Sequence, residues 1–276
     1  MLLISLIIAV LVKQMWGDRN PLHNDAWLDS VSSVFEQQLA RLMPVTNTLV
    51  FLTLLILTTI AVQLIALATH AGLMYVAFGV LLLLYCFGRD PFNECITQFI
   101  VAEARGDYEA ASAAALQLGA DLPTGQNWGA LNLTFIRAVS YRGFERFFAV
   151  VFWFVLIGPI GAWIYRFTHL WQQKHNNPSI EQWLFWLEWP AARVLALSYA
   201  ITGNFSACLN EGKTRLLSLD DNAKDTLLPA ILGALSVDEH VPQTREITRR
   251  ELEAIARLLS RTLWFWLGVI AITTVI

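Results

Sequence analysis

Charged residues are scarce in this sequence. Of its 276 residues, 15% are Asp, Glu, Lys or Arg, whereas 56% are hydrophobic. A soluble domain of this length has too little interior to hide so much apolar surface, so the composition excludes an ordinary soluble globular protein. The stretch between Arg41 and Arg89 has no Asp, Glu, Lys or Arg and is long enough for two helices across a hydrocarbon core about 30 Å thick. The sequence therefore predicts an all-α, polytopic helical membrane protein.

Cysteines are few, and positive charge is not in excess. Cys86, Cys95 and Cys208 have neither metal-ligand spacing nor an even count, so we expect no disulfide framework and no metal site. The net charge of −3 gives no reason to expect nucleic acid as a partner. The N-terminal MLLISLIIAVLV has no leading Lys or Arg and no small-residue cleavage site, so we do not expect a removed signal peptide. No motif indicates a cofactor or a catalytic residue.

Five apolar stretches are predicted to cross the membrane. The third of them contains no charged residue between Arg146 and Arg166. Gly158, Pro159 and Gly161 lie inside it and are expected to loosen or kink the helix and to let a neighbouring helix approach closely. The predicted spans are 46–68, 71–87, 147–168, 182–203 and 262–276.

The distribution of Lys and Arg predicts which segments face the cytoplasm. These residues are frequent in 88–146 and 204–261, whereas 169–182 has only one, so the positive-inside rule places the first two segments in the cytoplasm. Segment 182–203 must then cross the membrane, although it holds charged residues. Residues 1–16 are expected to form a short or part-inserted helix. Residues 25–41 follow the pattern of an amphipathic helix on a membrane surface or on the protein itself.

The cytoplasmic segments contain recognisable helix signals. Gly106 can end one helix in a left-handed cap and Asp107 can begin the next, which predicts two water-side helices before the loop DLPTGQN. The Ala-rich helix over 102–118 is expected to be a packing or docking surface for a protein partner or a second copy. Thr248 and Glu251 match a capping box at the head of the helix that continues into the last span.

The stretch ACLNEGKT at 207–214 ends in the letters of a phosphate-binding loop. Lys213 and Thr214 are the residues that would reach the phosphates and magnesium. However, the first Gly of the motif is missing, and the loop follows an apolar run of helical length, 194–209, instead of a strand. We therefore expect no nucleotide here, and predict that Gly212 and Lys213 form the cytoplasmic exit of a span.

Four ionisable or polar residues of the third and fourth spans are candidates for a site. Charged side chains inside a bilayer cost about 2.5–3.5 kcal/mol on insertion scales, so they normally face the protein interior and have a partner. Two interpretations stay open: a ligand-sensing polar pocket, or an internal ion pair that fixes the packing of two helices. The residues are Tyr165, Arg166, Glu188 and Arg193.

A second candidate cluster lies on the predicted cytoplasmic side. Arg137, Arg142, Glu145 and Arg146 share neighbouring helical turns, since Glu145 and Arg146 follow Arg142 by three and four positions. They are expected either to bind an anionic ligand or to anchor the protein beside anionic lipid. His70, at the predicted turn between the first two spans, is expected to be a capping or surface residue, because nothing near it completes a metal site.

Two longer stretches carry a family resemblance. From Tyr141 the sequence reads YRGFERFFAVVFWFVLIGPIGAWIYRFTHLW, and LEWPAARVLALSYAITGN follows after a short interval. Together they resemble the AmpE family of bacterial inner-membrane proteins, which is distantly similar to the CobD/CbiB membrane proteins of cobalamin biosynthesis. The resemblance implies a multi-pass protein of the inner membrane, associated with induction of a chromosomal β-lactamase in a pathway that responds to cell-wall recycling.

The sequence departs from the cobalamin proteins at their polar motifs. Glu145 is the only carboxylate in the first stretch, and Glu188 is a single acid without a neighbouring Asn in the second. Most groups that would hold a nucleotide, metal or amine are missing, which argues against that ligase activity. We therefore expect a non-enzymatic signalling or regulatory protein that acts by ligand sensing or by partner contacts, in contact with membrane lipid. The alternatives are a membrane-bound transferase or ligase related to cobinamide-phosphate synthase, and a transporter.

Overall fold

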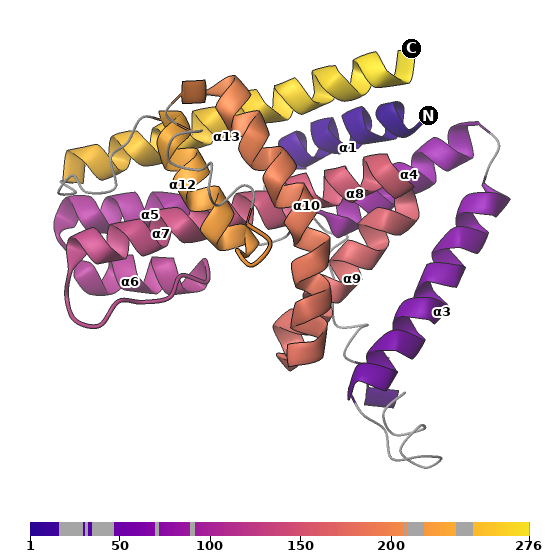
Figure 1. Cartoon of the computed structure of the whole chain (residues 1–276), viewed down its shortest axis with the longest axis horizontal. Helices are drawn as coiled ribbons and strands as arrows, with labels where there is room; N and C mark the ends of the chain where they lie inside the picture. The colour runs from indigo at the N-terminus through magenta and orange to yellow at the C-terminus, as the bar shows by residue number, and fades with distance from the viewer. Residues whose placement is uncertain are drawn as a thin grey trace. The chain divides into compact units, whose positions relative to one another are not determined.

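The computed structural model describes residues 1–16, 30, 33–34, 47–69, 72–88, 92–206, 208, 218–235 and 245–275. Every described element is helical, and no strand occurs in these ranges (Figure 1). The all-α prediction is therefore confirmed. Several predictions fall outside these residues: most of the helix expected over 25–41, the turn residue His70, and the stretch 207–214 apart from Cys208.

The chain divides into two compact units, each built from segments that are distant in sequence. The first unit contains Met1–Gly88 and Ala149–Leu187, and the second contains Arg89–Phe148 and Glu188–Ile276. The predicted cytoplasmic segment 88–146 thus falls almost entirely in the second unit, whereas the first two predicted spans fall in the first.

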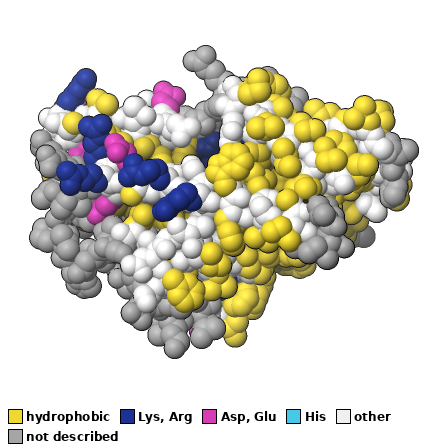
Figure 2. All heavy atoms as spheres, turned by 90° about the horizontal axis from the view of Figure 1, so that it is seen from above, with side chains coloured by type: hydrophobic (Ala, Val, Ile, Leu, Met, Phe, Trp, Pro, Cys, Tyr) yellow, Lys and Arg dark blue, Asp and Glu magenta, His cyan; other side chains and the backbone are white. Residues whose placement is uncertain are grey.

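Two helices of the described chain are long and apolar enough to cross a membrane. They are Asn47–Ala68 and Arg249–Ile272. Only 28% of the most apolar window of the first is buried, so this helix is not the covered core helix of a soluble protein. Ile56 and Leu64 are more than half exposed on it, and Figure 2 shows many exposed hydrophobic side chains on the face that it draws. The other predicted spans stay predictions.

The first unit begins with α1 (Leu2–Trp16), which runs parallel to α4 (Leu73–Cys86). Near the start of α1, Ser5 Oγ donates to Val76 O at 3.3 Å, and near its end Lys13 Nζ lies 4.7 Å from the ring centre of Phe87. The helices approach closely because Gly79 has no side chain: a Cβ there would be 2.9 Å from Ser5 Oγ. The helix predicted over 1–16 is confirmed, and its insertion stays a prediction.

The helices α3 (Asn47–Ala68) and α9 (Pro159–His175) pack side by side in opposite directions. Residues at the start of α3 therefore meet residues at the end of α9. Three contacts mark this pairing: Asn47 Nδ2 to His175 Nδ1 at 3.4 Å, Phe51 to Trp171 with ring centres 5.8 Å apart, and Trp163 Nε1 donating to Thr58 Oγ1 at 3.1 Å.

The single helix expected over 147–168 is wrong, because the chain reverses at Gly158. One helix, α8, covers Ala149–Ile157, and α9 begins at Pro159. Gly158 has φ 78° and ψ −156°, a conformation essentially restricted to Gly, and Pro159 has no N–H to continue the helix. Gly161 then lies directly against α8, where a Cβ would be 2.3 Å from Trp153 O. Two helices meeting at a turn replace the expected kink (Figure 1).

The second unit gathers the polar helices of the chain. The cap predicted between its first two helices is confirmed: Gly106 has φ 73°, and the Asp107 carboxylate accepts from Ala110 N–H at 3.0 Å. The capping box at Thr248 is wrong, because the last helix already begins at Arg245. The described elements are α5 (Phe92–Arg105), α6 (Tyr108–Gln117), α7 (Trp128–Gly143), a π-helical turn η1 (Phe144–Phe148), α12 (Ala223–Leu235) and α13 (Arg245–Val275). The unit also takes residues 188–202 of α10 (Pro178–Thr202).

Candidate functional site

The site of interest in the second unit centres on a hydrogen bond between α7 and α10. Tyr141 Oη donates to Glu188 Oε1 at 2.9 Å, and Glu188 is only 7% exposed. Burial, followed by the charges of Glu188 and Glu145, raises the pKa of Tyr141 well above its usual value, although Arg142 opposes this shift. The phenol therefore stays protonated and remains a donor to Glu188.

Arg142 and Glu145 form an ion pair close to Tyr141 in sequence. Glu145 lies in the π-helical turn η1 and is 1% exposed. Arg142 Nη1 lies 3.3 Å from its Oε2, and Arg142 Nε donates to Leu118 O at 2.9 Å. Gly119, at φ 82°, lets the guanidinium lie against the loop, since a Cβ there would be 2.7 Å from Arg142 Nη2. The sequence predicted that Arg142 and Glu145 would be neighbours, but not that the loop after α6 would hold the arginine.

The helix α12 contributes two charged residues to the other side of Tyr141. Lys224 Nζ lies 5.0 Å from the ring centre of Tyr141, within the range of a cation–π interaction. The next residue, Asp225, forms an ion pair with Arg137 of α7. Both contacts join α7 to the start of α12. Tyr141 thus has the cation of Lys224 against its ring and the carboxylate of Glu188 at its hydroxyl.

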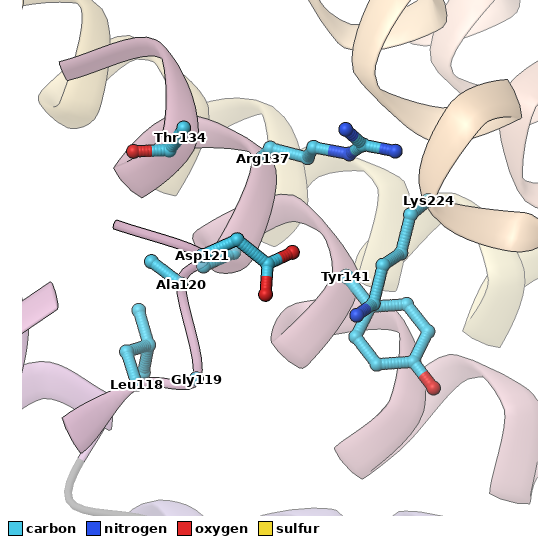
Figure 3. Close-up of a pocket in the computed structure, with 9 residues that line it drawn as sticks. Leu118, Gly119, Ala120, Asp121, Thr134, Arg137, Tyr141 and Lys224 are labelled. Carbon is cyan, nitrogen blue, oxygen red and sulfur yellow. The ribbon is translucent and has the colours of Figure 1, made fainter. Parts of the chain in front are cut away.

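A small cavity of about 40 Å³ opens beside Tyr141 (Figure 3). It has room for one or a few water molecules. The Asp121 side chain points into this space, while Arg137 and Lys224 approach from α7 and α12 (Figure 3). The wall offers both donors and acceptors, which suits a small neutral or zwitterionic polar group better than a free anion. The lining residues are Leu118, Gly119, Ala120, Asp121, Thr134, Arg137, Ala138, Tyr141 and Lys224.

Arg193, which the sequence marked as a candidate, fastens α10 to the loop before α12. Its Nη2 donates to Ser218 O at 2.7 Å and to Asp221 O at 2.8 Å. The guanidinium also stacks on Trp189, 4.4 Å from the ring centre. One planar cation thus satisfies two backbone carbonyls of a turn, a geometry that the fork of an arginine suits well.

The eight residues predicted as two clusters are divided between the two units. Tyr165 and Arg166 are buried in the first unit, whereas Glu188 and Arg193 bind groups of the second. A contact between the two pairs stays a prediction. Of the second cluster, Arg142 pairs with Glu145 at 3.3 Å, Arg137 pairs with Asp225, and Arg146 stacks on Phe92 at 5.0 Å. The binding of an anionic ligand or of anionic lipid by these four residues stays a prediction.

Three functional candidates were missed from the sequence. Tyr141 precedes Glu145 by four positions, a helical spacing that could have marked it as part of the same face. Lys224 and Asp225 carried no comparable signal, because their partners lie more than 80 positions away in the chain. Within the described ranges, no group of three or more His, Cys, Asp or Glu could hold a metal ion.

In the part of the chain that the structure describes, these features define an all-helical protein with two helices able to span a membrane and a buried polar cluster in its second unit. A family model described as regulatory signalling modulator protein AmpE matches residues 1–225. The chain therefore belongs to the AmpE family, as the two sequence stretches indicated, and this is a family of regulatory signalling modulators. No curated protein and no solved structure matched the chain.

Proposed function

We propose that this protein is a multi-pass regulatory component of a bacterial inner membrane that takes part in induction of a chromosomal β-lactamase. We further propose that it acts through the cluster of Tyr141 and Glu188, which would respond to a ligand or to a protein partner. Membership of a family of regulatory signalling modulators supports the regulatory role. The observation that carries the rest is the part-buried Tyr141–Glu188 hydrogen bond between two helices.

A regulatory element needs two states that differ by a modest free energy. A hydrogen bond to a charged group contributes about 1.5–3 kcal/mol, which corresponds to a roughly 10- to 100-fold change in an equilibrium. A ligand that competes for Glu188 or Tyr141 needs only a differential affinity of this size to shift the contact between α7 and α10. The polar cavity beside Tyr141 gives a small group access to that contact.

The membrane location has its own support. Besides its two helices of spanning length, the chain has apolar side chains that stay exposed on the shorter helices α1 and α4, including Leu11 and Leu73. Lipid is the partner that covers such surfaces at least cost. The polar helices of 88–146 are the proposed docking surface for a protein partner or a second copy. The transferase and transporter alternatives gain no specific support, since Glu145 and Glu188 both bind side chains of their own unit.

The role can be tested in a strain with an inducible chromosomal β-lactamase. The gene is deleted, and the strain is complemented with the wild type, with Glu188→Gln, or with Arg249→Gln as the matched control, whose side chain is 67% exposed. β-Lactamase activity is measured before and after an inducing β-lactam, at equal levels of each protein in the membrane. We expect the wild type and Arg249→Gln to restore the induction ratio and Glu188→Gln to fail. An unchanged ratio in the deletion strain would remove the proposed role.

A further inference from the structure

The reversal at Gly158 bears on how the first unit meets the membrane. Helix α8 continues the helical run of α7 and η1, and the last charged residue before the turn is Arg146. The uncharged arm Phe147–Ile157 is therefore about 16 Å long at 1.5 Å per residue, and α9, with 17 residues, is about 25 Å long. Neither length reaches across a hydrocarbon core of about 30 Å, and the first arm covers only about half of it. A chain that enters the membrane along α8 and turns back at Gly158 does not reach the opposite face.

The contacts with α3 show where the returning arm ends. α3 is the longest uncharged helix of the unit and can span the bilayer. Because α9 runs antiparallel to it, His175 is level with Asn47 at the beginning of α3, and Trp163 is level with Thr58 near its middle. Asn177 Nδ2 also donates to Thr48 Oγ1 at 3.3 Å, just beyond the end of α9. The segment after α9 therefore lies at the Asn47 end of α3.

The turn at Gly158 has exposed apolar side chains and satisfied backbone groups, as a turn in the hydrocarbon core of a bilayer requires. Val155, Leu156 and Ile157 precede it and are 36%, 61% and 54% exposed, which is unfavourable in water and favourable among acyl chains. Non-helical backbone at membrane depth is tolerated only where its polar groups are satisfied. Here Gly158 N–H donates to Phe154 O at 2.9 Å, and Pro159, the next residue, has no N–H to satisfy.

We propose that α8 and α9 form a re-entrant hairpin that inserts its apex, Val155–Gly158, among the acyl chains of the lipid bilayer and returns to the membrane face at which α3 begins. Residues 169–182 then lie on the same side as Asn47, whereas the distribution of positive charge placed them opposite the cytoplasmic segments. Tyr165 and Arg166 lie inside the returning arm and do not mark an outer surface. The proposal requires α3 to cross the membrane and is independent of any role in β-lactamase induction.

Sidedness can be measured with single cysteines and a membrane-impermeant maleimide. The buried Cys86, Cys95 and Cys208 are replaced by Ala, and one cysteine is introduced in each variant: Asn47→Cys and Thr69→Cys at the two ends of α3, and Gln173→Cys in the returning arm. Labelling is compared in intact and permeabilised cells. We expect Asn47→Cys and Gln173→Cys to be labelled from one side and Thr69→Cys from the other. Labelling of Gln173→Cys together with Thr69→Cys, or of both ends of α3 from one side, would overturn the proposal.

The depth of the apex has a matched control in the second unit. Leu156 at the apex and Leu116 in α6 are almost equally exposed, at 61% and 60%. A nitroxide attached at Leu156→Cys in the reconstituted full-length protein is expected to be relaxed by dissolved oxygen and shielded from a water-soluble nickel chelate. The nitroxide at Leu116→Cys is expected to show the reverse. Relaxation of the Leu156→Cys label by the chelate to the level at Leu116→Cys would show that the hairpin lies in water.

Discussion

Tyr141 joins the helices α7 and α10 through a hydroxyl that keeps its proton. Its hydroxyl has a carboxylate acceptor, Glu188, while Glu145 and Arg142 lie nearby with opposite charges. Since ionisation of the phenol would place a third negative charge in this cluster, the neutral donor is favoured far above neutral pH. Ionisation of Tyr141 therefore does not break the Tyr141–Glu188 bond at physiological pH.

The protonation of Tyr141 predicts a specific response to alkaline pH. A tyrosine in the unfolded chain loses its proton near pH 10, whereas the folded Tyr141 retains it at that pH because its pKa is raised. The contribution of this residue to stability is thus present below about pH 10 and is lost as pH rises further. Tyr141→Phe should lower the free energy of unfolding by about 1.5 kcal/mol at pH 8. Thermal unfolding in detergent should show this difference shrinking at higher pH, and a constant difference would be inconsistent with the assignment.

Among the elements, the turn between α8 and α9 depends on glycines for two separate reasons. Gly158 has open space around it but a backbone conformation that other residues rarely adopt, whereas Gly161 has an ordinary helical backbone but faces Trp153 O. The first glycine allows the reversal, and the second allows the two helices to pack after it.

Alanine substitutions separate these reasons. Gly158→Ala should lower the free energy of unfolding by about 1–3 kcal/mol through backbone strain alone. Gly161→Ala should lower it by about 1–3 kcal/mol through overpacking, because the new methyl meets a backbone atom that cannot move aside. The matched control is Gly268→Ala in α13, which has no neighbour within 4 Å and an ordinary backbone, and which should be neutral or stabilising by up to about 1 kcal/mol. Thermal unfolding of the three variants measures all of this, and equal losses in all three would contradict it.

Local signals in the sequence predicted some elements and not others. The Gly106–Asp107 boundary was predictable because both residues act on their own backbone within one turn. The prediction of a helix start at Thr248 was wrong, because a capping-box pattern marks only a possible start. The helix in fact begins three residues earlier, at Arg245. The reversal at Gly158 was expected only as a kink, since composition shows that a helix is interrupted but not how sharply the chain then turns.

At the scale of the whole molecule, the candidate site depends on contacts that no periodicity reveals. Glu188 and Arg193 were recognised from the sequence because charge in an apolar stretch needs a partner. Their partners were not, because Tyr141 and the loop at Ser218–Asp221 belong to segments far along the chain. The assembly of the second unit from two separate segments creates the contact between Tyr141 and Glu188, whereas Arg193 meets a loop of its own segment. Composition and family resemblance thus indicated the class of protein, while the arrangement of the site required the structure.

One hydrogen bond, from Tyr141 to Glu188, is proposed to carry the regulatory response. The most direct measurement is the β-lactamase induction ratio in the complemented deletion strain for Tyr141→Phe, Glu188→Gln and the double variant, at equal protein levels. If both residues act through the same bond, each single variant lowers the ratio and the double variant lowers it no further than the more affected single variant. Wild-type ratios for both single variants, or losses that multiply in the double variant, would contradict the account.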